Sequence, residues 1–118
     1  MTRYATAWAA GDRPALFACY DEDFTLHYFG CNPLAGVHRG KTASLAILAE
    51  VTRRTHRQLL AVLDIMAGPH RGAFLIRERF DRDGRTVERL LVYSVRDGLL
   101  GECRVYDQDQ ALIDQFLA

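Results

Sequence analysis

The sequence contains none of the common short metal-binding or redox motifs. It has three cysteines in 118 residues, none in a Cys-x-x-Cys arrangement, and four dispersed histidines without HxH or HExxH spacing. No glycine pattern indicates a dinucleotide or phosphate site. We therefore expect no metal and no cofactor, and the odd number of cysteines favours a reducing compartment over a disulfide framework.

An excess of charge of one sign is also missing. Fifteen basic and fifteen acidic residues cancel, which argues against nucleic acid as a partner. No apolar run approaches the length of about 18 residues that a membrane span needs, and the N-terminal residues do not form a secretory signal. The expected protein is cytoplasmic and soluble, with no membrane partner.

The chain has the size and composition of one globular domain, over residues 1–118, with a hydrophobic content of 49%. Apolar spacing and capping signals predict helices over residues 2–10, 12–20, 41–54 and 109–117. Alternation predicts a short strand over 24–29 and four longer ones over 57–66, 72–81, 86–95 and 99–107. Asp-Gly pairs at 83–84 and 97–98 favour hairpins between the last strands.

This order predicts an α+β fold. Four consecutive antiparallel strands form a meander, and a long curved sheet with helices on one face only can form a half-open cone. The other face of the sheet must be covered, and a second copy of the chain is the usual solution. We therefore expect a homodimer formed through the outer sheet face.

The element order, the N-terminal segment YATAWAAGD, the loop segment FTLHYFGCNPLAG and the C-terminal segment YDQDQALIDQFLA resemble the nuclear-transport-factor-2-like superfamily. The similarity is greatest to its SnoaL-like members, relatives of polyketide cyclases and ketosteroid isomerases. It covers essentially the whole chain. Because one fold hosts many functions, the resemblance implies the cone-shaped fold and a small-molecule pocket more firmly than a reaction.

The resemblance to ketosteroid isomerases implies a role for Tyr4. Those enzymes carry an oxyanion-binding tyrosine at the matching distance before an Ala-Gly-Asp turn. Their aspartate base falls here on Tyr28, or on His27 with a one-residue gap, and their second oxyanion donor falls near Leu91 or Val92. Two of the three parts are missing or changed, so steroid isomerisation by that mechanism is not expected.

Two other relatives imply different acids. Limonene epoxide hydrolases use an Arg-x-Asp pair, which Arg79-Phe80-Asp81 matches in letters, but their later acid falls near Val105. SnoaL-like cyclases place an acid–base aspartate beyond the last strand, where both Asp107 and Asp109 lie. Asp109 is also well placed as the N-cap of the last helix.

Strand alternation adds an independent argument for two acid–base groups. Asp107 shares a predicted strand face with Leu99, Gly101, Cys103 and Val105, at the open end of an apolar wall. His27 precedes the loop, and its imidazole can exchange protons near neutral pH. Tyr28 points to the opposite face, so only one of the pair can line a cavity. The alternatives to these roles are a solvated or capping aspartate and a histidine that shapes the loop.

The remaining candidates are expected to line the pocket or its mouth. Glu78 lies on an apolar strand face, so it either faces the cavity or is buried with an arginine such as Arg77, Arg79, Arg89 or Arg104. For Trp8 and Tyr93, core packing is the alternative. The predicted catalytic residues are His27, Asp107 and Tyr4, and the predicted ligand-binding residues are Trp8, Tyr28, Phe29, Leu34, Glu78, Tyr93, Cys103, Val105 and Asp109.

The sequence therefore predicts a pocket for a small hydrophobic molecule that bears a carbonyl or another polar group. If the protein is an enzyme, the expected chemistry is cofactor-free proton transfer, as in isomerisation, cyclisation or dehydration, with His27 or Asp107 moving the proton and Tyr4 polarising the oxygen. The alternative is a non-catalytic ligand-binding or dimerisation domain. A weaker alternative is epoxide hydrolysis through Arg79, Asp81 and Asp107.

Overall fold

The computed structural model describes residues 2–80 and 84–118. It begins with two short helices, α1 (Thr2–Ala10) and α2 (Arg13–Ala18). Gly11 ends α1 with a positive φ of 67°, a conformation that costs glycine little. Asp12 caps α2 by accepting a hydrogen bond from the Ala15 amide at 3.2 Å, as its position before a proline-containing first turn predicted.

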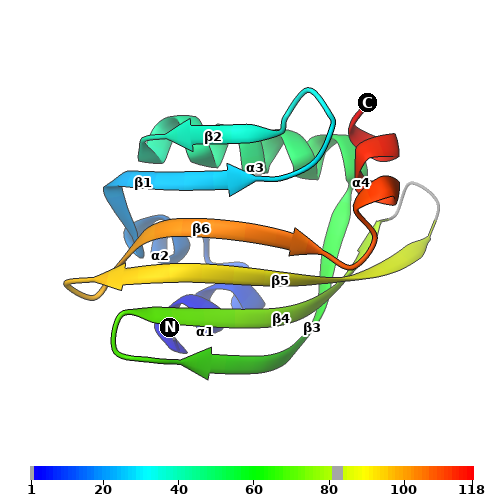
Figure 1. Cartoon of the computed structure of the whole chain (residues 1–118). Coiled ribbons are helices and arrows are strands. Elements are labelled where there is room, and N and C mark those ends of the chain that lie inside the picture. Colours follow the sequence, from blue (N-terminus) through cyan, green and yellow to red (C-terminus); the bar gives the residue numbers. More distant parts are fainter. Residues whose placement is uncertain (1, 81–83) are drawn as a thin grey trace.

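One six-stranded sheet follows, in the order β2-β1-β6-β5-β4-β3. The strands β1 and β6 are parallel, and every other neighbouring pair is antiparallel. The mixed sheet and the helices confirm the predicted α+β fold (Figure 1). The strands are β1 (Tyr20–Tyr28), β2 (Gly36–Arg39), β3 (Arg57–Ala67), β4 (Arg71–Phe80), β5 (Arg85–Arg96) and β6 (Leu99–Asp107).

The predicted meander of β3 to β6 is present. Asp97 and Gly98 join β5 to β6 with φ values of 53° and 75°, as expected of the tight hairpin that an Asp-Gly pair favours. The long helix α3 (Lys41–Thr55) ends where His56 turns into the left-handed region, with φ 51°. The last helix, α4 (Gln110–Leu117), is capped by Asp109, whose carboxylate accepts from the Leu112 amide at 3.1 Å.

Three local predictions were wrong. Gly36–Arg39, where no strand was predicted, is the strand β2, because it pairs antiparallel with the end of β1. The second helix ends at Ala18, and Tyr20 already belongs to β1. The strict alternation predicted for β6 fails at its start: Leu100 is buried together with Cys103 and Val105. The register shifts there by one residue against β5, which leaves Gly101 as the extra residue.

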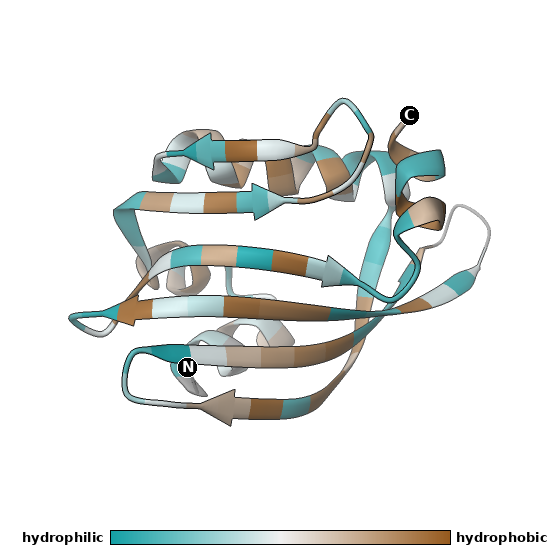
Figure 2. Ribbon diagram, viewed as in Figure 1, coloured by the Kyte–Doolittle hydropathy of each residue, from teal (hydrophilic) through white to brown (hydrophobic). Residues whose placement is uncertain are grey.

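The helices α1, α2 and α3 lie behind the sheet in Figure 1, while the face toward the reader carries no helix. The face under the helices, called here the inner face, holds the buried side chains of the strands, such as Leu26, Phe74, Ile76 and Val105. Hydrophobic residues continue along β4 and β5 (Figure 2). Among the described residues, no helix is long and apolar enough to cross a membrane.

Candidate functional site

A cavity of about 540 Å³ lies between the inner sheet face and the helices α1, α2 and α3. This volume is typical of sites for drug-sized molecules. Its walls are mainly apolar, with aromatic residues from the N-terminal helices, aliphatic residues from α3 and the middle of β5 and β6. The lining residues are Tyr4, Trp8, Arg13, Leu16, Phe17, Tyr20, Leu45, Leu48, Ala49, Thr52, Arg53, Arg57, Arg89, Leu91, Tyr93, Cys103 and Val105.

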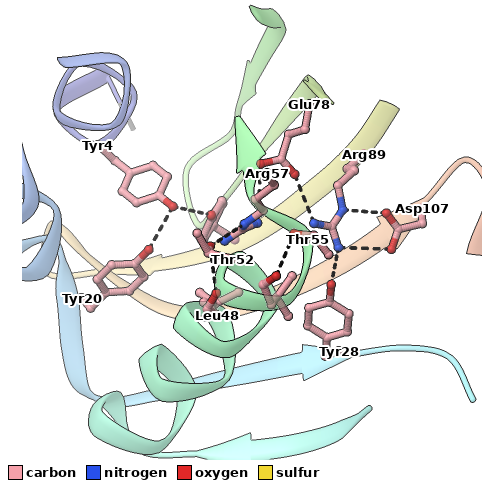
Figure 3. A network of polar contacts seen from close by, with 12 residues as sticks. Tyr4, Tyr20, Tyr28, Leu48, Thr52, Thr55, Arg57, Glu78, Arg89 and Asp107 are labelled. Atoms are coloured by element: carbon pink, nitrogen blue, oxygen red, sulfur yellow. Dashed lines mark hydrogen bonds and ion pairs between the residues drawn. The ribbon is translucent and has the colours of Figure 1, made fainter. Parts of the chain in front are cut away.

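Three tyrosines, Tyr4, Tyr20 and Tyr93, form a hydroxyl cluster at this cavity; Tyr4 and Tyr20 are labelled in Figure 3. The Tyr4 hydroxyl lies 2.9 Å from that of Tyr20 and 2.8 Å from that of Tyr93. Tyr4 also stacks on Phe74, with ring centroids 5.5 Å apart, which fixes the ring. The three residues come from α1, β1 and β5, so only the folded chain assembles the cluster.

Burial keeps the polar groups of this cluster neutral. It raises the pKa of Tyr4 to about 12, and it raises the pKa values of Tyr20 and Tyr93 well above the ordinary value. The adjacent thiol of Cys103 is affected in the same way, with a pKa raised to about 12. At neutral pH these groups are therefore hydrogen-bond donors and acceptors, and none is a base strong enough to remove a proton from carbon.

A second polar group, the Arg89 network, lies beside the first. The Arg89 side chain is only 1% exposed. Its Nε donates to the Asp107 carboxylate at 2.6 Å, its Nη1 to Glu78 at 3.1 Å, and its Nη2 to the Tyr28 hydroxyl at 2.6 Å. Burial alone raises the pKa of Glu78, but the charges of Arg57 and Arg89 outweigh it and hold that pKa below its ordinary value. Glu78 therefore stays ionised.

Arg57 connects the two groups. It is the first residue of β3, directly after the turn at His56 that ends α3. Its Nε donates to the Thr52 hydroxyl at 2.9 Å, and its Nη1 lies 3.5 Å from the Glu78 carboxylate. Arg57 lines the same cavity as Tyr4, Tyr20 and Cys103, and its positive charge offsets only part of the rise that burial causes in their pKa values.

Five of the residues predicted for the site line the cavity together: Tyr4, Trp8, Tyr93, Cys103 and Val105. Three others, Tyr28, Glu78 and Asp107, do not line the cavity themselves but meet at Arg89, which does. The Asp107 side chain is 1% exposed and bound to Arg89, so it is an ion-pair partner and does not line the cavity. Glu78 is likewise the buried partner of an arginine, one of the two alternatives that the sequence left open.

His27 lies on the other face of the sheet. It alternates with the buried Leu26 and Tyr28 and pairs in register with Val37 and Arg104. Its Nε2 lies 3.4 Å from the Glu102 carboxylate. Of the His27–Tyr28 pair, Tyr28 therefore points inward, and the imidazole cannot reach a molecule in the cavity.

The loop after β1 is also displaced from the cavity. The Asp114 carboxylate of α4 accepts hydrogen bonds from the Cys31 amide at 3.0 Å and from the Asn32 side chain at 2.8 Å. Phe29 is 40% exposed and stacks on Tyr106 of the outer face, with centroids 5.1 Å apart. Leu34 is buried in the core outside the cavity. Phe29 and Leu34 were expected to line the pocket or its mouth, but their loop is hydrogen-bonded to α4 instead.

The epoxide-hydrolase constellation is not assembled in the part of the chain that the structure describes. The Nη2 of Arg79 donates to the Gln58 side chain at 2.7 Å, Asp107 is bound to Arg89, and Asp81 lies outside the described residues. Asp109 is the helix cap of α4. None of these three described residues lines the cavity.

The sequence model of the SnoaL-like domain matches residues 1–102. The chain belongs to the SnoaL-like family. Solved structures agree: a protein of unknown function with a cystatin-like fold from Xanthomonas campestris is 21% identical with a TM-score of 0.87, the alignment covering 99% of this chain and 94% of that one. Bal32a, from a soil-derived mobile gene cassette, is 23% identical with a TM-score of 0.85, covering 99% and 92%.

A candidate polyketide cyclase from Sinorhizobium meliloti has the same fold, at 15% identity and a TM-score of 0.72, covering 88% of this chain and 90% of that one. Identities this low show the fold alone. A search of curated proteins found no match. The resemblance to SnoaL-like proteins seen in the sequence is thus confirmed, while the chemistry of this SnoaL-like domain has to be argued from its own cavity.

Sequence reasoning missed three polar residues of this SnoaL-like site. Tyr20 was assigned to the end of a helix, although the aromatic spacing of Tyr20 and Phe24 fits a strand that begins earlier. Arg57 was counted only as the first residue of a strand. Arg89 was considered as a partner for Glu78 and not as the centre of a network that also holds Asp107 and Tyr28.

Proposed function

We propose that this SnoaL-like domain binds a small, largely apolar molecule in the cavity, with a hydrogen-bond acceptor of that molecule at the hydroxyl cluster. The observation that carries the proposal is the chain of hydroxyls Tyr20–Tyr4–Tyr93. Three phenols supply three protons, and the two contacts between them use two. The third proton is shared between the weakly accepting Cys103 thiol beside Tyr93 and any stronger acceptor that a bound molecule brings into the cavity.

The same geometry supports binding over acid–base catalysis. Among the described residues that line the cavity there is no carboxylate and no histidine. The lining phenols and the Cys103 thiol have raised pKa values, so they are protonated at neutral pH. Isomerisation or cyclisation by proton transfer needs a base within hydrogen-bond reach of the substrate. Of the functions considered, the non-catalytic ligand-binding protein has the better support.

The proposal is tested with a neutral apolar dye, N-phenyl-1-naphthylamine, whose fluorescence rises in apolar surroundings. We expect saturable binding of one dye per chain. Ala49 lies on the cavity wall, so Ala49→Phe should fill the space and weaken binding by about tenfold or more, since ligand sites of this kind are shaped to their volume. Ala111→Phe, at an exposed position of α4, is the matched control. Equal binding by all three proteins would contradict the proposal.

We also propose that a second copy of the chain covers the outer sheet face, meaning the face without helices. Large side chains remain exposed there, among them Phe29, Val37, Met66 and Tyr106. On the same face, Leu75 of β4, Leu90 of β5 and Tyr106 of β6 are paired across neighbouring strands and form one row. Exposed apolar patches of this kind mark protein interfaces, and a symmetric dimer would bury the same patch twice.

The cytoplasm is the location that we propose. The three cysteines are all free, and Cys31 is exposed. Free, exposed thiols persist where the surroundings are reducing.

A further inference from the structure

The charged side chains that line the cavity are all of one sign. Among the described residues, they are Arg13, Arg53, Arg57 and Arg89, with no lysine, histidine or carboxylate. An otherwise apolar cavity with four guanidinium groups in its wall is unlike a plain hydrophobic pocket. Arginine is the residue best suited to planar, bidentate recognition of an anion.

The carboxylates behind the wall do not balance these arginines. Asp107 and Glu78 are both within hydrogen-bond distance of Arg89, and Glu78 also approaches Arg57. Glu50 is shared between Arg53 and Arg54. With Arg54 included, five guanidinium groups share three carboxylates. Arg13, at an exposed position of α2, has no ion-pair partner in the described part of the chain.

Arg57 is the arginine best placed to meet a bound molecule. Its side chain is 16% exposed, in contrast with Arg89 at 1% and Arg53 at 70%. Its Nε and Nη1 are engaged by Thr52 and Glu78, while Nη2 has no partner among residues 2–80 and 84–118. In Figure 3 the Arg57 side chain extends toward the hydroxyl cluster. Arg57 and the hydroxyl cluster therefore line the same cavity, where the Cys103 thiol beside Tyr93 is only a weak acceptor for the third phenolic proton.

We propose that the ligand of this site is a carboxylic acid with an apolar body, bound as the carboxylate. This assignment rests on the proposed binding function and deepens it. The two carboxylate oxygens accept from Arg57 and from the hydroxyl cluster, and the hydrocarbon or aromatic body packs on Trp8, Leu48 and Leu91. The available donors suit the two oxygens of a carboxylate, whereas the three terminal oxygens of a phosphate ester need more. Arg13 and Arg53 add an attractive field at the cavity.

The test compares probes with one ten-carbon chain and different head groups: decanoate, 1-decanol, decylamine and decyl phosphate. Trp8 is the single tryptophan of the sequence and lines the cavity, so its fluorescence reports occupancy. We expect decanoate to bind about tenfold or more tightly than 1-decanol, because hydrogen bonds to charged groups add to affinity. Decylamine should bind more weakly than the alcohol. Decyl phosphate binding more tightly than decanoate would overturn the assignment of a carboxylate.

Two variants test which arginines cause the preference for decanoate over 1-decanol. Arg57→Met should reduce the preference for decanoate over 1-decanol to within about threefold, with the affinity for 1-decanol little changed, because only the charged contact is lost. Arg13 is at an exposed position, where a substitution has little effect on folding. Arg13→Gln should lower the affinity for decanoate by about twofold to threefold and reduce the dependence of that affinity on salt concentration. Arg39→Gln, an exposed arginine outside the cavity, is the control and should change neither. An undiminished preference in both Arg57→Met and Arg13→Gln would overturn the assignment; if Arg57→Met fails to fold, Arg13→Gln decides.

The failure of this inference differs from the failure of the proposed function. Equal affinity for decanoate, 1-decanol and decylamine would contradict the proposal of a carboxylate ligand but would still support an apolar binding site. Absence of binding by all four probes and by the neutral dye would overturn both.

Discussion

The hydroxyl groups of Tyr4 and Tyr93, 89 positions apart in the chain, lie 2.8 Å from each other in the wall of the cavity. A buried phenol pair that also binds Tyr20 is costly unless each hydroxyl is satisfied. The cluster therefore stabilises the packing of α1 on the sheet, and in the function proposed above it also donates a hydrogen bond to the ligand. Removing the Tyr4 hydroxyl tests both roles, because stability and ligand affinity are measured separately.

Tyr4→Phe removes that oxygen while it keeps the ring that stacks on Phe74. We expect the free energy of unfolding to fall by about 1–3 kcal/mol, because the buried hydroxyls of Tyr20 and Tyr93 each lose a partner. We also expect decanoate affinity to fall by about fivefold or more. Urea unfolding and Trp8 fluorescence measure the two effects. A stability loss without any loss of affinity would show that the cluster is structural only.

Arg89→Met tests the buried ion-pair network. It leaves the Glu78 and Asp107 carboxylates, 2% and 1% exposed, without their shared cation. Removing one member of a buried ion pair destabilises by about 3–5 kcal/mol, so the urea midpoint should fall sharply. The control is Arg77→Met, whose pair with Glu88 is at the surface, with side chains 45% and 36% exposed. It should cost less than about 1 kcal/mol, and similar losses in both variants would contradict a special role for Arg89.

Acid should destabilise the protein through Glu78. The nearby guanidiniums of Arg57 and Arg89 hold the pKa of this carboxyl below its ordinary value despite burial. A folded pKa below the unfolded one gives stability that is present above the unfolded value of about 4.3 and is lost as the pH falls through the folded pKa. The free energy of unfolding, measured from pH 7 to pH 3, should decline below about pH 4.3. In Glu78→Gln this decline should be shallower, and an unchanged slope would contradict the assignment.

The outer face should mediate dimerisation. Leu90 is in the middle of the cross-strand row between Leu75 and Tyr106. We expect sedimentation equilibrium to give a dimer for the wild type and a monomer for Leu90→Lys, because a buried, unpaired charge at an interface costs several kcal/mol. Gln115→Lys adds the same charge at an exposed position of α4 and should stay dimeric. A monomeric wild type would refute the proposed dimer.

Much of the fold could be predicted from local signals. The Asp12 and Asp109 caps and the Asp97-Gly98 hairpin are local features in which side chain and backbone decide the conformation. Strand β2 was not predicted because a segment of four residues is too short for a clear apolar alternation. Its conformation is determined by pairing with β1. The bulge at Gly101 likewise depends on the neighbouring strand.

The site was predictable only in part. Period-two alternation places His27 and Tyr28 on opposite faces but does not say which face the helices cover. Tyr4 was identified by the resemblance to ketosteroid isomerases, and Cys103 and Val105 by strand alternation, while for Trp8 and Tyr93 the same spacing left core packing as an alternative. Arg57 and Arg89 carry the charge of the site, yet nothing in their sequence surroundings distinguishes them from other arginines of the strands. Their role appears only when β3, β5 and β6 bring Glu78 and Asp107 to them.

The central claim is that a small molecule binds on the inner face of the sheet, between the helices and the hydroxyl cluster. The most direct measurement is a titration of the ¹⁵N-labelled protein with decanoate, followed by amide and indole NMR signals. We expect saturable shifts at the Trp8 indole and at the amides of Leu48, Tyr93 and Cys103, which line the cavity, and none at His27 or Arg104 on the outer face. Shifts confined to the outer face, or no saturable shifts at all, would contradict the account.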